Sequence, residues 1–146
     1  MIPVITAEEE LQPPRTEEPP TVLKTRRVLV VDDEIEFAKV MSDSLAALGH
    51  TVDIAADGEE AWRMVRQADY DCLIVDLIMP RMNGLELYKM IKAWDVRVAD
   101  RCVFLTGAIL DAELGEFVTK SGNPSLRKPV SLDTVQKVIS ELADSN

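Results

Sequence analysis

Residues 71–84 read DCLIVDLIMPRMNG, and this stretch decides how the rest of the chain is interpreted. Its apolar run ends in a carboxylate, Asp76, and the turn that follows carries Pro80 and the pair Asn83 and Gly84. A short continuous apolar run bounded by turn residues is typical of a strand buried on both faces of a parallel sheet. Because ligands of open α/β sheets bind outside the carboxyl ends of the strands, we expect Asp76 to be the reactive residue.

The composition indicates one globular domain rather than two. The chain has 146 residues, enough for a proper core but too few for two comparable domains. Its 26 acidic and 16 basic residues give a net charge of -10, which argues against direct binding to nucleic acid. No signal-peptide pattern occurs, and no apolar run approaches the roughly 18 residues of a membrane span. We therefore expect a cytoplasmic protein without membrane contact.

The residue types that most often serve metal or redox chemistry are expected to have no such role in this chain. Cys72 and Cys102 lie inside apolar runs, so we interpret them as small core residues of a reducing compartment. His50 is the only histidine, and it follows Gly49 in a turn with no cysteine nearby. We predict that its side chain is exposed to solvent and has no function.

The first 26 residues differ in composition from the rest of the chain. They contain five prolines, five glutamates and no apolar period. This composition is typical of a linker or tail that is largely disordered. The domain is therefore expected to occupy residues 27–146.

Beyond the tail, short apolar runs alternate with stretches of helical periodicity. The runs occupy residues 28–31, 51–56, 71–76, 103–105 and, more weakly, 125–126. The second run alternates apolar and polar residues, which places it at the edge of the sheet. Asp57 and Glu60 resemble a capping box that opens a helix through Ala68. Trp62 and Trp94 belong to helical stripes that are expected to face the core. This alternation predicts an α/β three-layer sandwich, with a parallel five-stranded sheet and right-handed crossovers.

Polar residues follow four of the predicted strands and should meet at one edge of the sheet. They are Asp32, Asp33, Asp76, Thr106 and Lys128. Carboxylates that converge in a partly buried place repel one another, so we expect a cation among them. Mg²⁺, with Mn²⁺ as the alternative, prefers such oxygen ligands. A metal, a nucleophilic carboxylate, a hydroxyl and an ammonium are the parts needed to form an aspartyl phosphate.

In this pattern the chain resembles the receiver domains of two-component response regulators. The resemblance runs from residue 27 to about residue 143. It rests on VDDE at 31–34, VDLIMP at 75–80, NG at 83–84, LTG at 105–107 and KP at 128–129. Each motif alone is weak, but all of them occur in order and next to a predicted strand. The resemblance implies a flavodoxin-like (βα)5 fold with strand order 2-1-3-4-5.

The resemblance also implies a role for each acidic residue. Asp76 would accept a phosphoryl group from the phosphohistidine of a histidine kinase or phosphotransfer domain. Asp33, Asp76 and the backbone carbonyl of Ile78 would bind Mg²⁺, while Asp32 would act mainly through water. The isolated chain would therefore be a phosphoacceptor and not an enzyme.

Two further residues would contact the transferred group. Thr106 and Lys128 would bind the phosphoryl oxygens, and the bond between Lys128 and Pro129 would be cis. The family usually carries tyrosine or phenylalanine three residues before this lysine, where this chain has Ser125. The usual inward movement of an aromatic ring is therefore not expected, although a movement of Thr106 could still shift the loop behind it.

Two apolar residues predict a long-lived phosphoaspartate. Ile78 and Ala108 stand two positions after Asp76 and Thr106, where related proteins often have polar side chains. Neither residue can orient an attacking water by hydrogen bonding.

The parent protein is interpreted from weaker signals. No DNA-binding segment follows the last predicted helix, so we expect the output to lie in a partner or in a longer chain. Residues 122–129 (GNPSLRKP) look like the terminal receivers of hybrid sensor histidine kinases, and residues 1–4 are similar to the closing strand of a kinase ATPase domain. This favours a hybrid-kinase receiver. A free-standing single-domain regulator or a phosphate sink is the alternative.

Two other classes of protein fit the sequence less well. A Mg²⁺-dependent aspartyl-phosphate phosphatase would need a second carboxylate just after Asp76 as general acid, and Leu77 and Ile78 supply none. A binding module with a vestigial acidic cluster is disfavoured because the set of aspartate, threonine and lysine is complete.

Overall fold

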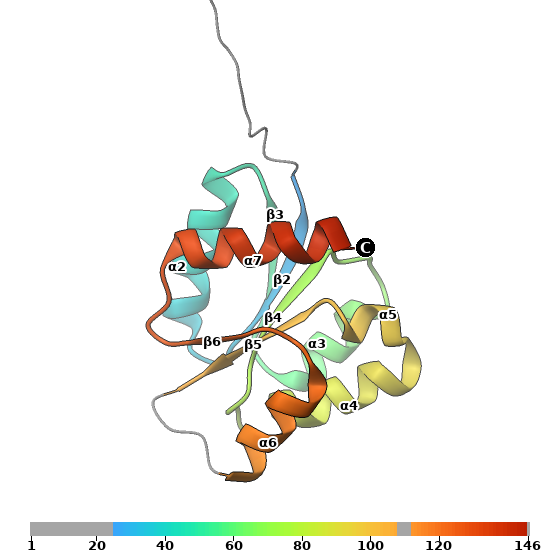
Figure 1. Ribbon diagram of the computed structural model, residues 1–146. Helices are drawn as coiled ribbons and strands as arrows, with labels where there is room; N and C mark the ends of the chain where they lie inside the picture. The colour runs from blue at the N-terminus through green and yellow to red at the C-terminus, as the bar shows by residue number, and fades with distance from the viewer. Residues whose placement is uncertain (1–24, 108–111, 146) are drawn as a thin grey trace, which may run out of the picture.

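The computed structural model describes residues 25–107 and 112–145, which form a sheet with helices on both faces (Figure 1). Its strands are β2 (Arg27–Val31), β3 (Thr51–Ala55), β4 (Cys72–Asp76), β5 (Cys102–Thr106) and β6 (Ser125–Arg127). Its helices are α2 (Ile35–Ala47), α3 (Gly58–Val65), α4 (Gly84–Trp94), α5 (Val96–Ala99), α6 (Ala112–Ser121) and α7 (Leu132–Ser145). Among these described helices, none is long and apolar enough to cross a membrane. The predicted tail lies outside the described residues except for Thr25 and Arg26.

The five strands are all parallel and lie in the order β3-β2-β4-β5-β6. Counted from the first described strand, this is the predicted order 2-1-3-4-5, so the predicted fold class is confirmed. Every residue of β4 and β5 is buried, whereas β3 is only partly buried along most of its length. The continuous apolar runs therefore became the interior strands, and the alternating run became an edge strand as predicted.

Alternate residues of the central strands build two separate cores. Val28 and Val30 pack with side chains of α2 and α7 on one face of the sheet. Leu29 and Val31 pack on the other face with side chains of α3 and α4. Figure 1 shows the same division, with α2 and α7 on one side and α3, α4 and α5 on the other. Side chains of β2 thus point alternately to the two faces of the sheet, and helices that pack on both faces give three layers.

Helix α3 begins at an N-cap that the sequence predicts, but its ends differ from the prediction. The Asp57 side chain accepts a hydrogen bond from the Glu60 amide at 2.8 Å. The Glu60 carboxylate accepts from the Ala56 amide at 2.7 Å rather than from Asp57, so the expected reciprocal capping box is absent between these residues. The helix ends at Val65 and not at Ala68, because the chain turns there toward β4.

The two cysteines are buried as predicted, whereas the tryptophans only partly follow the prediction. Cys72 and Cys102 are fully buried, and burial raises the pKa of both thiols. Trp62 packs against the core from a partly buried position. Trp94 is 47% exposed, so the prediction that it faces the core is wrong. It is the last residue of α4, and its ring packs edge-on against Trp62 with centroids 5.7 Å apart.

The prediction that His50 is exposed is also wrong. Gly49, with φ of 99°, turns the chain after α2 so that His50 lies buried at 5% exposure. Its Nδ1 accepts a hydrogen bond from the Arg26 amide at 3.0 Å, and its Nε2 lies 2.7 Å from the side-chain oxygen of Gln136. Because Nδ1 is the acceptor, this network places the ring proton on Nε2, which donates to Gln136. His50 is therefore a structural residue that joins the start of β2 to α7.

Replacing Gly84 with alanine should destabilise the domain by about 2–3 kcal/mol, because the new methyl group has no space. A Cβ at this position would lie 2.5 Å from the carbonyl oxygen of Asp76 and 2.9 Å from the Cα of Leu77, and neither backbone atom can move freely. Urea denaturation measures the effect.

The matched control is Gly115→Ala in α6, where nothing lies within 4 Å of the new Cβ. Alanine there should stabilise the helix by roughly 0.5–1 kcal/mol. Equal stabilities of the two variants would show that the close approach at Gly84 is not a constraint.

Candidate functional site at the carboxyl edge of the sheet

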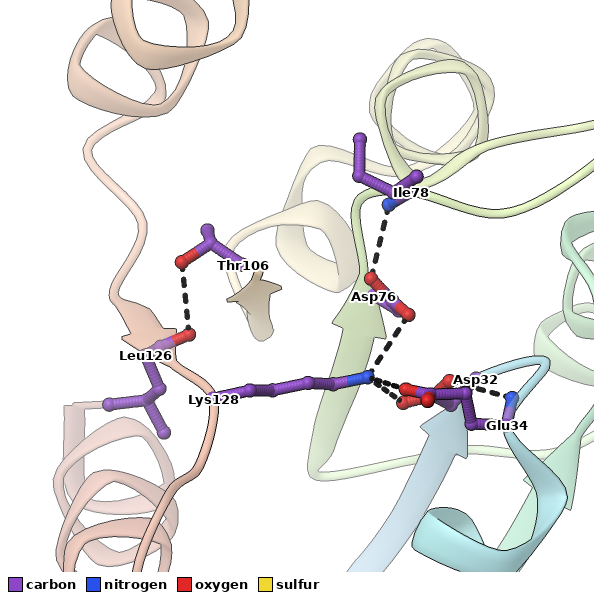
Figure 2. A network of polar contacts seen from close by, with 7 residues as sticks. All are labelled: Asp32, Glu34, Asp76, Ile78, Thr106, Leu126 and Lys128. Atoms are coloured by element: carbon purple, nitrogen blue, oxygen red, sulfur yellow. Dashed lines mark hydrogen bonds and ion pairs between the residues drawn. The ribbon is translucent and has the colours of Figure 1, made fainter. Parts of the chain in front are cut away.

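Asp76 ends β4 and lies at the centre of a polar network (Figure 2). Its side chain is nearly buried, at 6% exposure. Its Oδ1 accepts a hydrogen bond from the Ile78 amide at 3.1 Å, and its Oδ2 accepts one from Lys128 Nζ at 3.3 Å. The two oxygens are thus oriented by different partners, one from the following loop and one from the far edge of the sheet.

The predicted acidic cluster is present. Asp32 and Asp33 follow β2, which pairs with β4 so that Val31 lies beside Val75. The residues that follow these neighbouring strands therefore emerge together, and carboxylate oxygens of Asp32, Asp33 and Asp76 all lie within 4.8 Å of one another. Asp32 is fully buried, and Asp33 is exposed.

Lys128 is the cation that this cluster holds. Its Nζ lies 2.8 Å from Asp32 Oδ2, 2.6 Å from Glu34 Oε1 and 3.3 Å from Asp76 Oδ2. The same atom lies 4.5 Å from the centre of the Phe37 ring. Burial disfavours the charged ammonium, but the surrounding carboxylates outweigh burial and raise the pKa of Lys128. The predicted phosphate-binding lysine is therefore a fully charged partner of the acidic cluster.

The pKa of Asp76 is raised to about 6. Burial is the main cause, and the neighbouring charge of Asp32 adds to it. The Ile78 amide and the Lys128 ammonium act in the opposite direction. At neutral pH the side chain is therefore mostly ionised, which is the form that can act as a nucleophile.

The carboxylates fit a hard divalent cation. Among the described residues, no hydrogen bond reaches the buried Oδ2 of Asp32, which has the Lys128 ammonium as its ion-pair partner. Three carboxylates within 4.8 Å form the all-oxygen set that Mg²⁺ prefers. The structure places Ile78 beside Asp76 through its amide, and the binding of a metal by its carbonyl stays a prediction.

Thr106 reaches the same edge of the sheet, but its hydroxyl faces away from the carboxylates. It ends β5 and is nearly buried, at 7% exposure. Its Oγ1 donates a long hydrogen bond of 3.5 Å to the carbonyl of Leu126 in β6, as Figure 2 shows. To contact a group bound at Asp76, the side chain would have to leave this bond.

The remaining predicted residues have mixed outcomes. The bond between Lys128 and Pro129 is cis, as the resemblance implied. Ser125 is exposed at the start of β6. Ala108 lies outside the described residues.

The loop after Asp76 is fixed by contacts to two helices. Arg81 adopts a left-handed backbone, with φ of 62°, and its guanidinium donates a 2.6 Å hydrogen bond to Asp57 at the start of α3. Asn83 and Glu86 form a reciprocal capping box at the start of α4. Left-handed backbone is unfavourable for a residue with a side chain, so the surrounding contacts must stabilise it.

A cleft of about 350 Å³ opens beside Asp76. It is lined by Asp33, Glu34, Asp76, Ile78, Gly107 and Lys128. Glu34 and Phe37 belong to this site, although sequence reasoning gave them no role. The available signal was the position of Glu34 directly after the two aspartates, but no pattern showed that α2 would direct both residues toward Lys128.

The chain matches known proteins over most of the described residues. Residues 28–140 match the family model of the response regulator receiver domain. Transcriptional regulatory protein TcrA of Mycobacterium tuberculosis is 32% identical over 107 residues, which cover 73% of this chain and 42% of that protein. The chain therefore spans less than half the length of this relative.

Two solved structures share the fold. Chemotaxis protein CheY4 of Vibrio cholerae is 28% identical, with a TM-score of 0.71 over 82% of this chain and 99% of that one. Response regulator protein TrrA of Thermotoga maritima, solved in complex with Mg(2+)-BeF, is 25% identical, with a TM-score of 0.70 over 81% of this chain and 99% of that one. The described fold thus corresponds to nearly the whole length of each structure.

Replacing Asp76 with asparagine should increase the free energy of unfolding at pH 7, by on the order of 1 kcal/mol, when divalent metal is absent. The pKa of Asp76 is raised from 3.8 to about 6 in the folded protein, so the folded state loses stability relative to the unfolded state as the pH rises through this window. At pH 4 the carboxyl group is protonated in the folded state and partly protonated in the unfolded state, so most of the advantage of asparagine should disappear. Urea denaturation at pH 4 and pH 7 measures the free energy of unfolding of the variant and of the unmodified sequence.

The control is Asp43→Asn on the exposed surface of α2, which should show no comparable pH-dependent gain. An advantage of Asp76→Asn that is equal at pH 4 and pH 7 would contradict the electrostatic explanation.

Proposed function

The chain belongs to the response regulator receiver domain family, and on that premise we propose that Asp76 accepts a phosphoryl group from the phosphohistidine of a histidine kinase or phosphotransfer domain. One observation carries this proposal. A nearly buried carboxylate ends β4 beside an open cleft, with the Lys128 ammonium 3.3 Å from one of its oxygens and two further carboxylates within 4.8 Å.

The residues around Asp76 have separable roles in this transfer. A carboxylate oxygen would form a bond to phosphorus while the bond from phosphorus to the donor imidazole nitrogen breaks, and the imidazole would leave with the bonding electrons. The Ile78 amide orients the carboxylate by holding Oδ1. The Lys128 ammonium would bind phosphoryl oxygens. The Thr106 hydroxyl would also bind one of them, once it has given up its hydrogen bond to the Leu126 carbonyl.

We further propose that Mg²⁺, or Mn²⁺ in its place, binds at Asp32, Asp33 and Asp76 with the Ile78 carbonyl. The convergence of three carboxylates supports this proposal. The similar protein TrrA was solved in complex with Mg(2+)-BeF, which also supports it. When bound, a divalent ion neutralises charge on the phosphoryl oxygens during transfer.

We infer that the phosphorylation signal is read by a partner or by another part of a longer protein. TcrA is a transcriptional regulatory protein, and the match covers only 42% of its length. This similarity supports a response-regulator parent. The placement at the end of a hybrid histidine kinase rests on the likeness of residues 122–129 and 1–4 alone.

Incubation with acetyl phosphate and Mg²⁺ should add one phosphoryl group to the chain, because the carboxylate, the ammonium and the proposed metal ligands are all in place. Intact mass spectrometry measures the gain. Asp76→Asn and an EDTA-treated sample are the controls, and both should show no gain. A gain that persists in Asp76→Asn would place the acceptor elsewhere and refute the proposal.

Replacing Ile78 with asparagine should accelerate loss of the phosphoryl group by about three- to tenfold, because an amide can orient an attacking water and an isoleucine cannot. Ile78 is 57% exposed and lines the cleft, so the substitution should leave the fold intact. The decay of the phosphorylated mass with time gives the rate.

Val40→Asn is the matched control, since Val40 is an apolar residue on α2 that is 66% exposed and does not line the cleft. Equal decay rates for Ile78→Asn and the unmodified sequence would rule out the proposed reason for a long-lived phosphoaspartate.

A further inference from the structure

Glu34 holds the lysine of the site from the solvent side. The distance of 2.6 Å between its Oε1 and Lys128 Nζ is the shortest of the three ion pairs of this ammonium. The Glu34 side chain is 65% exposed, whereas those of Asp32 and Asp76 are 0% and 8% exposed. In Figure 2, dashed lines join the Nζ atom to the carboxylates of Asp76, Asp32 and Glu34.

The start of α2 supplies two contacts to this ammonium. Glu34 is the N-cap residue of α2, and the ring of Phe37 in the first turn lies 4.5 Å from Nζ. The amide of Glu34 also donates a 2.9 Å hydrogen bond to Asp32 Oδ1, which fixes the backbone from which the side chain extends. The contact between Glu34 and Lys128 is therefore built on a fixed backbone rather than on a free surface chain.

Glu34 differs from the other carboxylates in one respect. It lines the cleft with Asp76 and Lys128 but does not belong to the group of carboxylates within 4.8 Å that could share a metal ion. A cation that neutralises Asp32 and Asp76 would leave Glu34 as the remaining anionic partner of the ammonium. A phosphoryl donor that binds Lys128 would then compete with Glu34 for the ammonium.

We propose that Glu34 is a specificity-determining residue that slows the phosphorylation of Asp76 by small, multiply charged phosphoryl donors. This inference rests on the proposed function and names a donor preference for the same site. Two effects act in the same direction. The carboxylate repels an anion that enters the cleft, and it competes with that anion for the Lys128 ammonium.

With acetyl phosphate the reaction balances without a further reactant. A carboxylate oxygen of Asp76 forms a bond to phosphorus, the bond between phosphorus and the acyl oxygen breaks, and acetate leaves with the electron pair. The donor enters with two negative charges. Glu34 opposes this entry, whereas a neutral side chain of the same size would not.

Replacing Glu34 with glutamine tests the proposal, because the amide keeps the size of the side chain and removes its charge. An exposed ion pair contributes modestly, so we expect the rate of phosphorylation by acetyl phosphate at subsaturating concentration to rise about two- to fivefold. The gain should be smaller with phosphoramidate, which carries one negative charge fewer. It should also shrink at high ionic strength, where exposed charges are screened.

The matched control is Glu36→Gln, which removes the same charge from an exposed residue in the first turn of α2 that does not line the cleft. Its phosphorylation rate should equal that of the unmodified sequence. Thermal unfolding of both variants checks that the fold is retained.

The outcomes separate the inference from the proposed function. A rate for Glu34→Gln that is equal to or lower than that of the unmodified sequence would overturn the inference while leaving Asp76 as the phosphoacceptor. An equal gain in Glu36→Gln would also overturn it, because the effect would then be one of net charge. Absence of phosphorylation in the unmodified sequence would overturn the proposed function and the inference together.

Discussion

The convergence of like charges at one edge of the sheet is the constraint on which the rest of the site depends. The parallel pairing of β2 with β4 brings Asp32, Asp33 and Asp76 together, and Asp32 is fully buried. A buried carboxylate without a partner is strongly unfavourable, so Lys128 must reach it from the far edge strand. The edge strand β6 ends where it can deliver this side chain, since the Lys128 amide donates to the Thr106 carbonyl at 2.9 Å. One ammonium thus links the first, third and fifth described strands.

The same edge requires a loop that closes tightly after Asp76. The carbonyl of Asp76 lies so close to Gly84 that a methyl group would not fit. Arg81 has a left-handed backbone, and its side chain pairs with Asp57. These contacts return the chain to α4 and leave the Ile78 amide directed at the Asp76 carboxylate. The backbone amide of Ile78 thus orients the Asp76 carboxylate, and the exposed side chain of the same residue lines the cleft that leads to it.

The fold and the positions of the site residues were predictable because each depends on a local pattern. Continuous apolar runs specify buried strands, and the residue that follows each run must lie at the carboxyl edge, as Asp32, Asp76 and Thr106 do. Side-chain directions were not predictable, because they depend on contacts between residues far apart in the chain. The Thr106 hydroxyl faces Leu126, and Glu34 contacts Lys128, a residue 94 positions away.

The two errors on aromatic rings have the same origin. The position of His50 after a glycine turn suggested exposure, but α7 packs over that turn and supplies Gln136 as its partner. The helical spacing of Trp94 suggested burial, but Trp94 is the last residue of α4, and its ring stays 47% exposed beside Trp62. Periodicity identifies the face of a helix that packs inward, and it does not say how far the neighbouring layer extends.

The balance of charge at the site explains why one exposed glutamate matters. Three carboxylates, those of Asp32, Glu34 and Asp76, contact a single ammonium. The Asp33 carboxylate lies close to two of them, so the site carries excess negative charge before any donor arrives. The proposed divalent ion would offset only part of this excess, and a phosphoryl group would add to it. Asp32, Asp33 and Asp76 are the carboxylates proposed to bind this ion, and Glu34 is not among them. It is therefore the one carboxylate of this group through which evolution could adjust the entry of anionic donors without changing the proposed metal site or the proposed acceptor.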